Sequence, residues 1–119
     1  MNTEMPIGKP TQPVLYHLHI YFDDVSAEIA WQIRSKATEH PQVMSVGRFH
    51  KRPIGPHPVR QFQLLVSSAN LDAVTQWLDS VRGHLDVLIH PEIDDDLLAH
   101  TDLAQWLGQP HTLELDRFR

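Results

Sequence analysis

The feature that most constrains this chain is a strict alternation of apolar and polar side chains over residues 14–22. One set of alternating positions holds Leu18, Ile20 and Phe22, and the other holds His17, His19 and Tyr21. A period of two is typical of a strand that buries one face. The chain is therefore expected to contain a sheet with an apolar face and a face that carries imidazole and phenol side chains.

Extended and helical patterns alternate along the rest of the chain. Further strands are expected at residues 43–50, 59–67 and 85–90, and helices at 27–39 and along the apolar stripe from Leu71 to Val81. A last short helix is expected to run through Trp106, with residues 113–115 as a candidate tail strand. This order predicts an α+β fold, a ferredoxin-like βαββαβ sandwich with an antiparallel sheet and a short extra C-terminal helix. The length fits a single domain, 14–119, behind a flexible leader, 1–13.

The expected topology brings distant histidines together. The first and third strands are expected to be central neighbours that run parallel, with the fourth strand antiparallel beside the first. The start of the first strand, the loop entering the third and the end of the fourth would then meet, bringing together His17, His57 and His90. The helices would cover the apolar face. The other face is expected to be open to water or covered by a second subunit, and because Leu65 and Leu88 would be exposed there, we expect a homodimer.

Composition narrows the chemistry and the partners. The chain has no cysteine, so thiolate zinc sites, iron-sulfur clusters and cysteine nucleophiles are excluded, and any metal must be held by nitrogen and oxygen. A formal net charge of -5 with scattered cations argues against a nucleic-acid partner. No segment approaches the roughly 20 apolar residues of a membrane span, and residues 1–13 lack the features of a signal peptide. We therefore expect a cytoplasmic protein without membrane contact.

The chain carries nine histidines, which is unusual for its length. His17 and His19 leave one face of a strand about 7 Å apart, and the topology adds His90 and His57. Neutral imidazoles suit zinc, copper, iron and nickel, and three of them leave coordination positions open. Structural explanations compete with this hypothesis. They are a solvated strand face for the first pair, a sheet-edge cap for His90, an exposed turn for His57 and helix packing for His100.

Three blocks of sequence contain most of these histidines. They are Tyr16-His17-Leu18-His19-Ile20-Tyr21-Phe22, then Gly55-Pro56-His57-Pro58, then His90-Pro91 followed by Asp95-Asp96-Leu97, His100-Thr101 and Trp106-Leu107-Gly108. Together they resemble the DOPA 4,5-dioxygenase family over residues 16–115, and every family histidine is matched. The family pattern has Thr-Gly before the acidic pair, where this chain has Ile93 and Asp94. The local turn at those two positions therefore departs from the family.

The resemblance implies extradiol cleavage of a catechol such as DOPA, with non-haem Fe(II) as cofactor and dioxygen as co-substrate. Another divalent metal, such as zinc, is the alternative in the isolated protein. The implied metal ligands are His17, His19 and His90, and His57 is the implied catalytic base for the second catechol proton. The residues implied to hold the polar tail of the substrate are Tyr21, Arg48 and His100.

Two other functions fit the same pattern. A non-catalytic ferredoxin-like dimeric binding module would use the open sheet face as an interaction surface, with the histidines as incidental polar residues. A monooxygenase of the same general fold would need no metal and would tolerate substitution of the histidines. A bound metal and a concave pocket would favour the dioxygenase over both.

Overall fold

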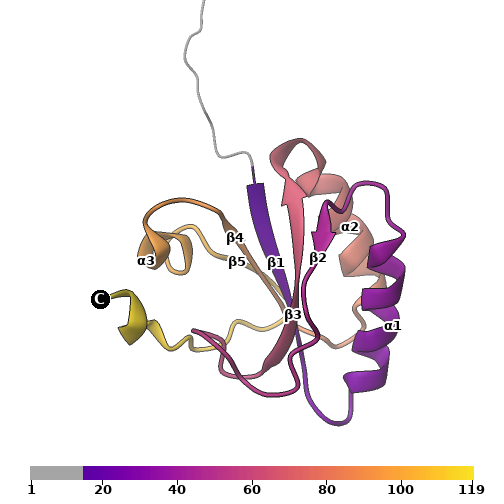
Figure 1. Cartoon of the computed structure of the whole chain (residues 1–119), viewed down its shortest axis with the longest axis horizontal. Helices are drawn as coiled ribbons and strands as arrows, with labels where there is room; N and C mark the ends of the chain where they lie inside the picture. The colour runs from indigo at the N-terminus through magenta and orange to yellow at the C-terminus, as the bar shows by residue number, and fades with distance from the viewer. Residues whose placement is uncertain (1–14) are drawn as a thin grey trace, which may run out of the picture.

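The computed structural model describes residues 15–119, so the leader predicted at 1–13 lies outside the described residues. These residues form one five-stranded sheet in the order β2-β3-β1-β4-β5, with helices beside it (Figure 1). The strands are β1 (Leu15–Phe22), β2 (Ser45–Val46), β3 (Arg60–Ser67), β4 (Val87–Pro91) and β5 (Gln105–Leu107). The helices are α1 (Ala27–Thr38), α2 (Leu71–Val81) and α3 (Asp96–Ala99), with 3-10 turns η1 (Ser68–Asn70) and η2 (Leu115–Phe118). In this part of the chain, every helix is too short or too polar to cross a membrane.

The strand order confirms the ferredoxin-like arrangement, but one predicted direction is wrong. β1 lies between β3 and β4, as expected. β3 runs antiparallel to β1, however, and pairs Phe22 with Arg60 and Leu15 with Ser67. The parallel strands are β1 and β2, which α1 connects, and β3 is inserted between them. The loop that enters β3 therefore begins near the end of β1 rather than near its start.

The strand predicted at residues 43–50 shortens to β2. Core contacts in this segment recur every three positions, at Val43, Val46 and Phe49, whereas a strand would place them at every second position. Pairing continues only through separate contacts, including a single bridge between His50 and Gln61. The segment therefore stays beside β3 without forming a regular strand, and Phe49 packs against Trp31 of α1.

The C-terminal segment also differs from the prediction. The short extra helix is present as α3, but it ends at Ala99, and Trp106 lies in β5 opposite Leu88. β5 pairs with the outer edge of β4, whose backbone groups would otherwise lack strand partners. Residues 113–115 form no strand, and η2 begins at the last of them.

The core lies between the sheet and the pair α1 and α2, which cover the same face (Figure 1). The predicted apolar face of β1 is buried there, with Leu18 and Ile20 fully inaccessible. β3 contributes the matching alternate positions, and α2 contributes its apolar stripe. The fully buried members are Phe62, Leu64, Val66, Val74 and Leu78. Burying this apolar surface stabilises the fold by about 25 cal/mol per Å². The apolar face of β1 therefore points to the core, and the histidines lie on the opposite face.

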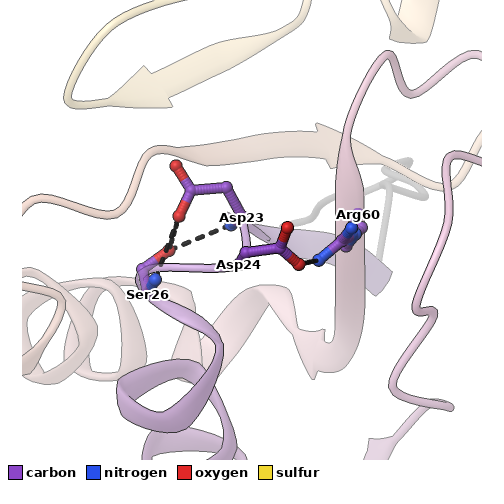
Figure 2. A network of polar contacts seen from close by, with 4 residues as sticks. All are labelled: Asp23, Asp24, Ser26 and Arg60. Atoms are coloured by element: carbon purple, nitrogen blue, oxygen red, sulfur yellow. Dashed lines mark hydrogen bonds and ion pairs between the residues drawn. The ribbon is translucent and has the colours of Figure 1, made fainter.

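A polar network fixes the connection between β1 and α1 (Figure 2). The Asp23 backbone N–H donates to Ser26 Oγ, and the Ser26 N–H donates to Asp23 Oδ1, at 3.0 and 2.9 Å. The Ser26 N–H and the Ser26 hydroxyl both donate to the Asp23 carboxylate, which favours its ionised form and lowers the pKa of Asp23. The neighbouring Asp24 forms an ion pair with Arg60 at the start of β3. The end of β1 is thereby joined to the segment that carries His57.

The histidine face of the sheet is covered by the chain itself. α3, the C-terminal segment and the segment before β3 lie on the side of the sheet away from α1 and α2 (Figure 1). Leu88, which the sequence suggested would be exposed there, is fully buried. Leu65 stays partly exposed. The apolar surface used to argue for a homodimer is therefore smaller than expected, and the homodimer itself stays a prediction.

Alanine at Gly108 is expected to destabilise the fold more than alanine at Gly83. Both glycines have a positive φ, 81° and 60°, so either substitution introduces about 1 to 2 kcal/mol of backbone strain. A Cβ atom at Gly83 would meet open space, whereas one at Gly108 would collide with the Asp86 carboxylate. That carboxylate accepts a hydrogen bond from the Gln109 N–H and pairs with His111. We expect a total loss of about 3 kcal/mol for Gly108→Ala, measured by urea unfolding, and equal losses at the two positions would contradict this account.

Candidate metal centre

Three histidines from β1 and β4 form one cluster. His17 and His90 are directly opposite each other in the antiparallel pair, and His19 lies two residues further along the same face of β1. Each residue offers one ring nitrogen as a possible ligand, and these three nitrogens lie within 4.8 Å of one another. His19 and His90 are buried, while His17 is partly exposed. These are the three residues that the sequence nominated as metal ligands, and the structure brings them together.

Hydrogen bonds fix the tautomers of the two buried histidines. His90 Nδ1 lies 3.0 Å from the Pro91 carbonyl oxygen, which can only accept, so Nδ1 carries the proton. His19 Nδ1 lies 2.8 Å from Gln61 Oε1 and donates to it in the same way. The remaining nitrogens, His19 Nε2 and His90 Nε2, face each other at 3.1 Å. In the neutral state, both of these nitrogens present a lone pair.

Electrostatics keep both rings neutral. Burial lowers the pKa of His90 to about 3, and burial followed by repulsion from His57 and the other histidines lowers the pKa of His19 well below its ordinary value. At neutral pH, no proton therefore lies between the two facing nitrogens. Two nitrogens that bind one metal at about 2.0–2.1 Å are about 2.9 to 3.4 Å apart. The observed separation and the facing lone pairs fit a shared cation.

His17 has a different environment at the rim of the cluster. Its Nε2 lies 2.7 Å from Glu92 Oε1, and its ring centroid is 5.0 Å from that of His90. The Glu92 carboxylate can orient this ring as a hydrogen-bond acceptor or supply an oxygen ligand. Asp95, from the acidic run before α3, caps that helix, because its Oδ1 accepts from the Leu98 N–H at 2.9 Å.

His57 reaches the cluster from the segment before β3. Its ring centroid lies 4.1 Å from that of His19, and its Nδ1 lies 2.8 Å from the Tyr21 hydroxyl. Burial, then repulsion from His100, His50 and Arg117, lowers the pKa of His57 to about 4. Burial raises the pKa of Tyr21, so its hydroxyl keeps its proton. His57, the expected base, and Tyr21, an expected substrate contact, therefore both lie beside the histidine cluster.

His100 lies at the C-terminal end of α3, over the same cluster. Its ring centroid is 4.0 Å from that of His90 and 6.4 Å from that of His57. Its Nδ1 donates to the Asp96 carbonyl at 2.7 Å, so Nε2 is its free nitrogen. Phe118, from η2, packs against the ring at 4.7 Å. The C-terminal turn therefore covers this side of the site.

Arg48 is the one expected site residue that lies away from the cluster. It follows β2 and lines a separate hollow beside α1, together with Trp31 and Phe49. The resemblance implied Arg48 as a substrate contact, but Phe49 beside it packs against Trp31 of α1, on the side of the sheet away from the cluster.

Several contacts around the cluster were not predicted from the sequence. His111 pairs with Asp86 at 2.8 Å and packs edge-on against Tyr21 at 4.9 Å. Trp106, which was expected in a helix, packs against the same tyrosine at 5.7 Å. Gln61 could have been found from its place on the histidine face of the neighbouring strand. For His111, no local pattern signalled the contact, because it depends on how the C-terminal segment folds back.

Leucine at Gln61 is expected to weaken metal binding without removing a ligand. The change removes the acceptor that holds His19 Nδ1–H, so Nδ1 is left buried without a partner and the ring can change tautomer. Loss of such a supporting hydrogen bond costs about 10- to 100-fold in metal affinity. Competition with a chromophoric chelator measures the change. Gln63→Leu is the matched control on the same strand face, and an equal loss there would contradict a specific role for Gln61.

Comparison with known proteins gives consistent matches. The sequence model of the Dopa 4,5-dioxygenase family matches residues 16–117. DOPA 4,5-dioxygenase from Amanita muscaria is 30% identical over 108 residues, which cover 84% of this chain and 47% of that protein. An uncharacterized 21.2 kDa protein from Botryotinia fuckeliana is 31% identical over 111 residues, covering 84% of this chain and 61% of that protein. The chain thus spans about half the length of the curated relatives it matches.

A solved structure shares the fold over nearly the whole of both chains. The crystal structure of a candidate dioxygenase from Nostoc punctiforme superposes with a TM-score of 0.82 at 34% identity. The match covers 87% of this chain and 89% of that chain. The arrangement of sheet and helices described above is therefore one that a natural relative of similar length adopts.

Proposed function

Because the chain belongs to the Dopa 4,5-dioxygenase family, we propose that it is a metal-dependent dioxygenase that opens the ring of a catechol such as DOPA. The observation that carries this proposal is the buried pair His19 and His90, whose unprotonated nitrogens face each other at 3.1 Å. Two histidines that only stabilise the fold would be expected to share a proton or to have their ring nitrogens further apart. A pair that binds a metal has the arrangement found here.

The proposed reaction is an extradiol cleavage. The ring carbon–carbon bond beside the diol breaks, and both atoms of dioxygen enter the product, which gains one aldehyde and one carboxylate group. The catechol is oxidised and dioxygen is reduced, so the balance requires no further reductant. A monooxygenase would instead place one oxygen atom in the product and release the other as water.

Non-haem Fe(II) is the metal we propose, with zinc as the alternative in the isolated protein. The residues that would hold it are His17, His19 and His90, each of which offers one imidazole nitrogen to the cluster. Glu92 is a further candidate through its carboxylate. When bound, the iron would bring a catecholate and dioxygen to adjacent positions, which is the chemistry the protein side chains cannot supply.

His57 is the proposed base for the second catechol proton. In the required tautomer its Nδ1–H donates to the Tyr21 oxygen, which leaves Nε2 free to accept a proton. A pKa of about 4 keeps the ring unprotonated before substrate binds. A negatively charged catecholate beside the ring would raise that pKa toward the range in which proton transfer is efficient.

Tyr21 and His100 are the proposed contacts for polar groups of the substrate. Both lie within the same cluster of rings, and His100 has a free Nε2. Arg48 lies apart from these residues, so we do not assign it to the substrate site. Burial of His57, His19 and His90 limits water around the reacting groups.

The binding-module alternative needs an open sheet face, and the described residues do not provide one over β1 and β4. Leu88, Gln61 and the facing histidines are all buried by other parts of the same chain. The metal-free monooxygenase alternative leaves the facing lone pairs unexplained. A cytoplasmic location and a homodimer stay predictions.

Anaerobic loading with Fe(II) tests the proposal. The protein is desalted, its iron is measured by elemental analysis, and DOPA or a simpler catechol is added in air while absorbance and oxygen uptake are followed. We expect about one iron per chain, a yellow ring-opened product, and no turnover in the metal-free protein. Iron that is lost on desalting, together with absence of product, would contradict the proposal and favour a binding module.

A further inference from the structure

A second candidate site lies between α1 and the segment that follows β2. It is a hollow of about 630 Å³, within the usual size range of small-molecule sites. Its lining, which we call the basic hollow, consists of Trp31, Arg34, Arg48, Phe49 and Lys51. None of the clustered histidines contributes to it.

The charge of the basic hollow is unusual for this protein. It gathers three of the ten Lys and Arg residues of a chain whose formal net charge is -5. No carboxylate lines it, whereas four other hollows on the described surface each include at least one acidic residue. Within residues 15–119, the ion pairs involve other cations. Arg34, Arg48 and Lys51 are therefore available to an anion.

The walls of the hollow are held in place before any ligand binds. Arg34 Nε donates to the Gly47 carbonyl at 3.0 Å, and its guanidinium lies 5.2 Å from the centroid of the Trp31 ring. Phe49 stacks on Phe22 at 4.3 Å and meets Trp31 edge-on at 5.2 Å. Trp31 nevertheless remains 49% exposed. A large aromatic surface that faces solvent beside a fixed guanidinium suits a flat ligand.

We propose that the basic hollow binds a small aromatic anion, a planar ring that carries a carboxylate. The ring would lie against Trp31 and Phe49, and the carboxylate would pair with Arg48 and Lys51. An aliphatic anion would leave the aromatic surface exposed, and a neutral ring would leave the cations unpaired. The site is separate from the histidine cluster and does not depend on the dioxygenase proposal.

Nuclear magnetic resonance of the full chain tests this assignment. The probe is naphthalene-2-carboxylate, and the matched neutral compound is naphthalene-2-carboxamide. The carboxylate is expected to shift the indole N–H signal of Trp31 in a saturable way while the signals of Trp77 and Trp106 stay in place. The amide is expected to bind at least about tenfold more weakly, because it cannot form the charge-assisted hydrogen bonds.

Two variants test the residues. Arg48→Ala is expected to weaken binding of the carboxylate by about tenfold. Lys36→Ala, which removes an exposed cation of α1 outside the hollow, is expected to leave binding unchanged. Equal binding of carboxylate and amide, equal effects of the two variants, or no saturable shift of Trp31 would each overturn the proposal. A Trp31 signal that instead shifts with protein concentration alone would also overturn it, by showing an interface between copies of the chain.

Discussion

Alanine at His19 or His90 is expected to lower the affinity for a divalent metal by more than about a hundredfold, beyond the effect of losing a supporting hydrogen bond. Each change removes one of the two buried nitrogens that face each other at 3.1 Å. The metal would then lose one of its ligands, and the remaining histidines would hold it less tightly. Elemental analysis after desalting, followed by competition with a chelator, measures the loss.

Two controls separate ligand loss from misfolding. His84→Ala removes an exposed histidine away from the cluster and is expected to retain metal like the wild type. His90→Leu keeps a buried side chain of similar volume and removes the facing lone pair, so the metal-free variant is expected to unfold at the same or a higher temperature. Metal retention at the wild-type level in either His19→Ala or His90→Ala would rule out the assignment of that residue.

Alanine at His57 is expected to slow ring opening by about a hundredfold to ten-thousandfold, the usual contribution of a positioned base. His57 is not among the three histidines assigned to the metal, so iron content is expected to stay the same. Steady-state rates on iron-loaded protein, normalised to measured iron, give the effect. A normal rate in His57→Ala with normal iron would contradict the assignment of His57 as base.

Tyr21→Phe is the companion measurement for His57. It removes only the hydroxyl that lies 2.8 Å from His57 Nδ1. The base then keeps its place but loses the hydrogen bond that orients its ring, so we expect a rate loss of about tenfold, smaller than that of His57→Ala. A larger loss in Tyr21→Phe than in His57→Ala would indicate that the tyrosine has a direct role.

The alternation in β1 predicted much of the fold and the centre of the site. A period of two assigns Leu18 to the core and His17 and His19 to the opposite face without any tertiary information. The antiparallel partner β4 then brings His90 to the same place, because its register pairs it with His17. Strong local periodicity and one correct strand neighbour were sufficient for these three residues.

Other features depend on packing that local pattern does not encode. The direction of β3 follows from the whole chain path, not from its own sequence, and the predicted parallel pairing was wrong. The resemblance implied Arg48 as a substrate contact, but the three-residue spacing of Val46 and Phe49 on the core places Arg48 beside α1, away from the histidines. His111 meets Tyr21 only because the C-terminal segment returns over the sheet.

The most direct test of the central claim is turnover of a catechol by the iron-loaded protein under ¹⁸O₂, with rapid trapping and mass spectrometry of the product. Trapping by reduction prevents exchange of the aldehyde oxygen with water. We expect both labelled atoms to enter one ring-opened product. The His90→Ala protein is expected to form no ring-opened product. A product with a single labelled atom and an intact ring, or equal product from His90→Ala, would contradict a dioxygenase that depends on this histidine cluster.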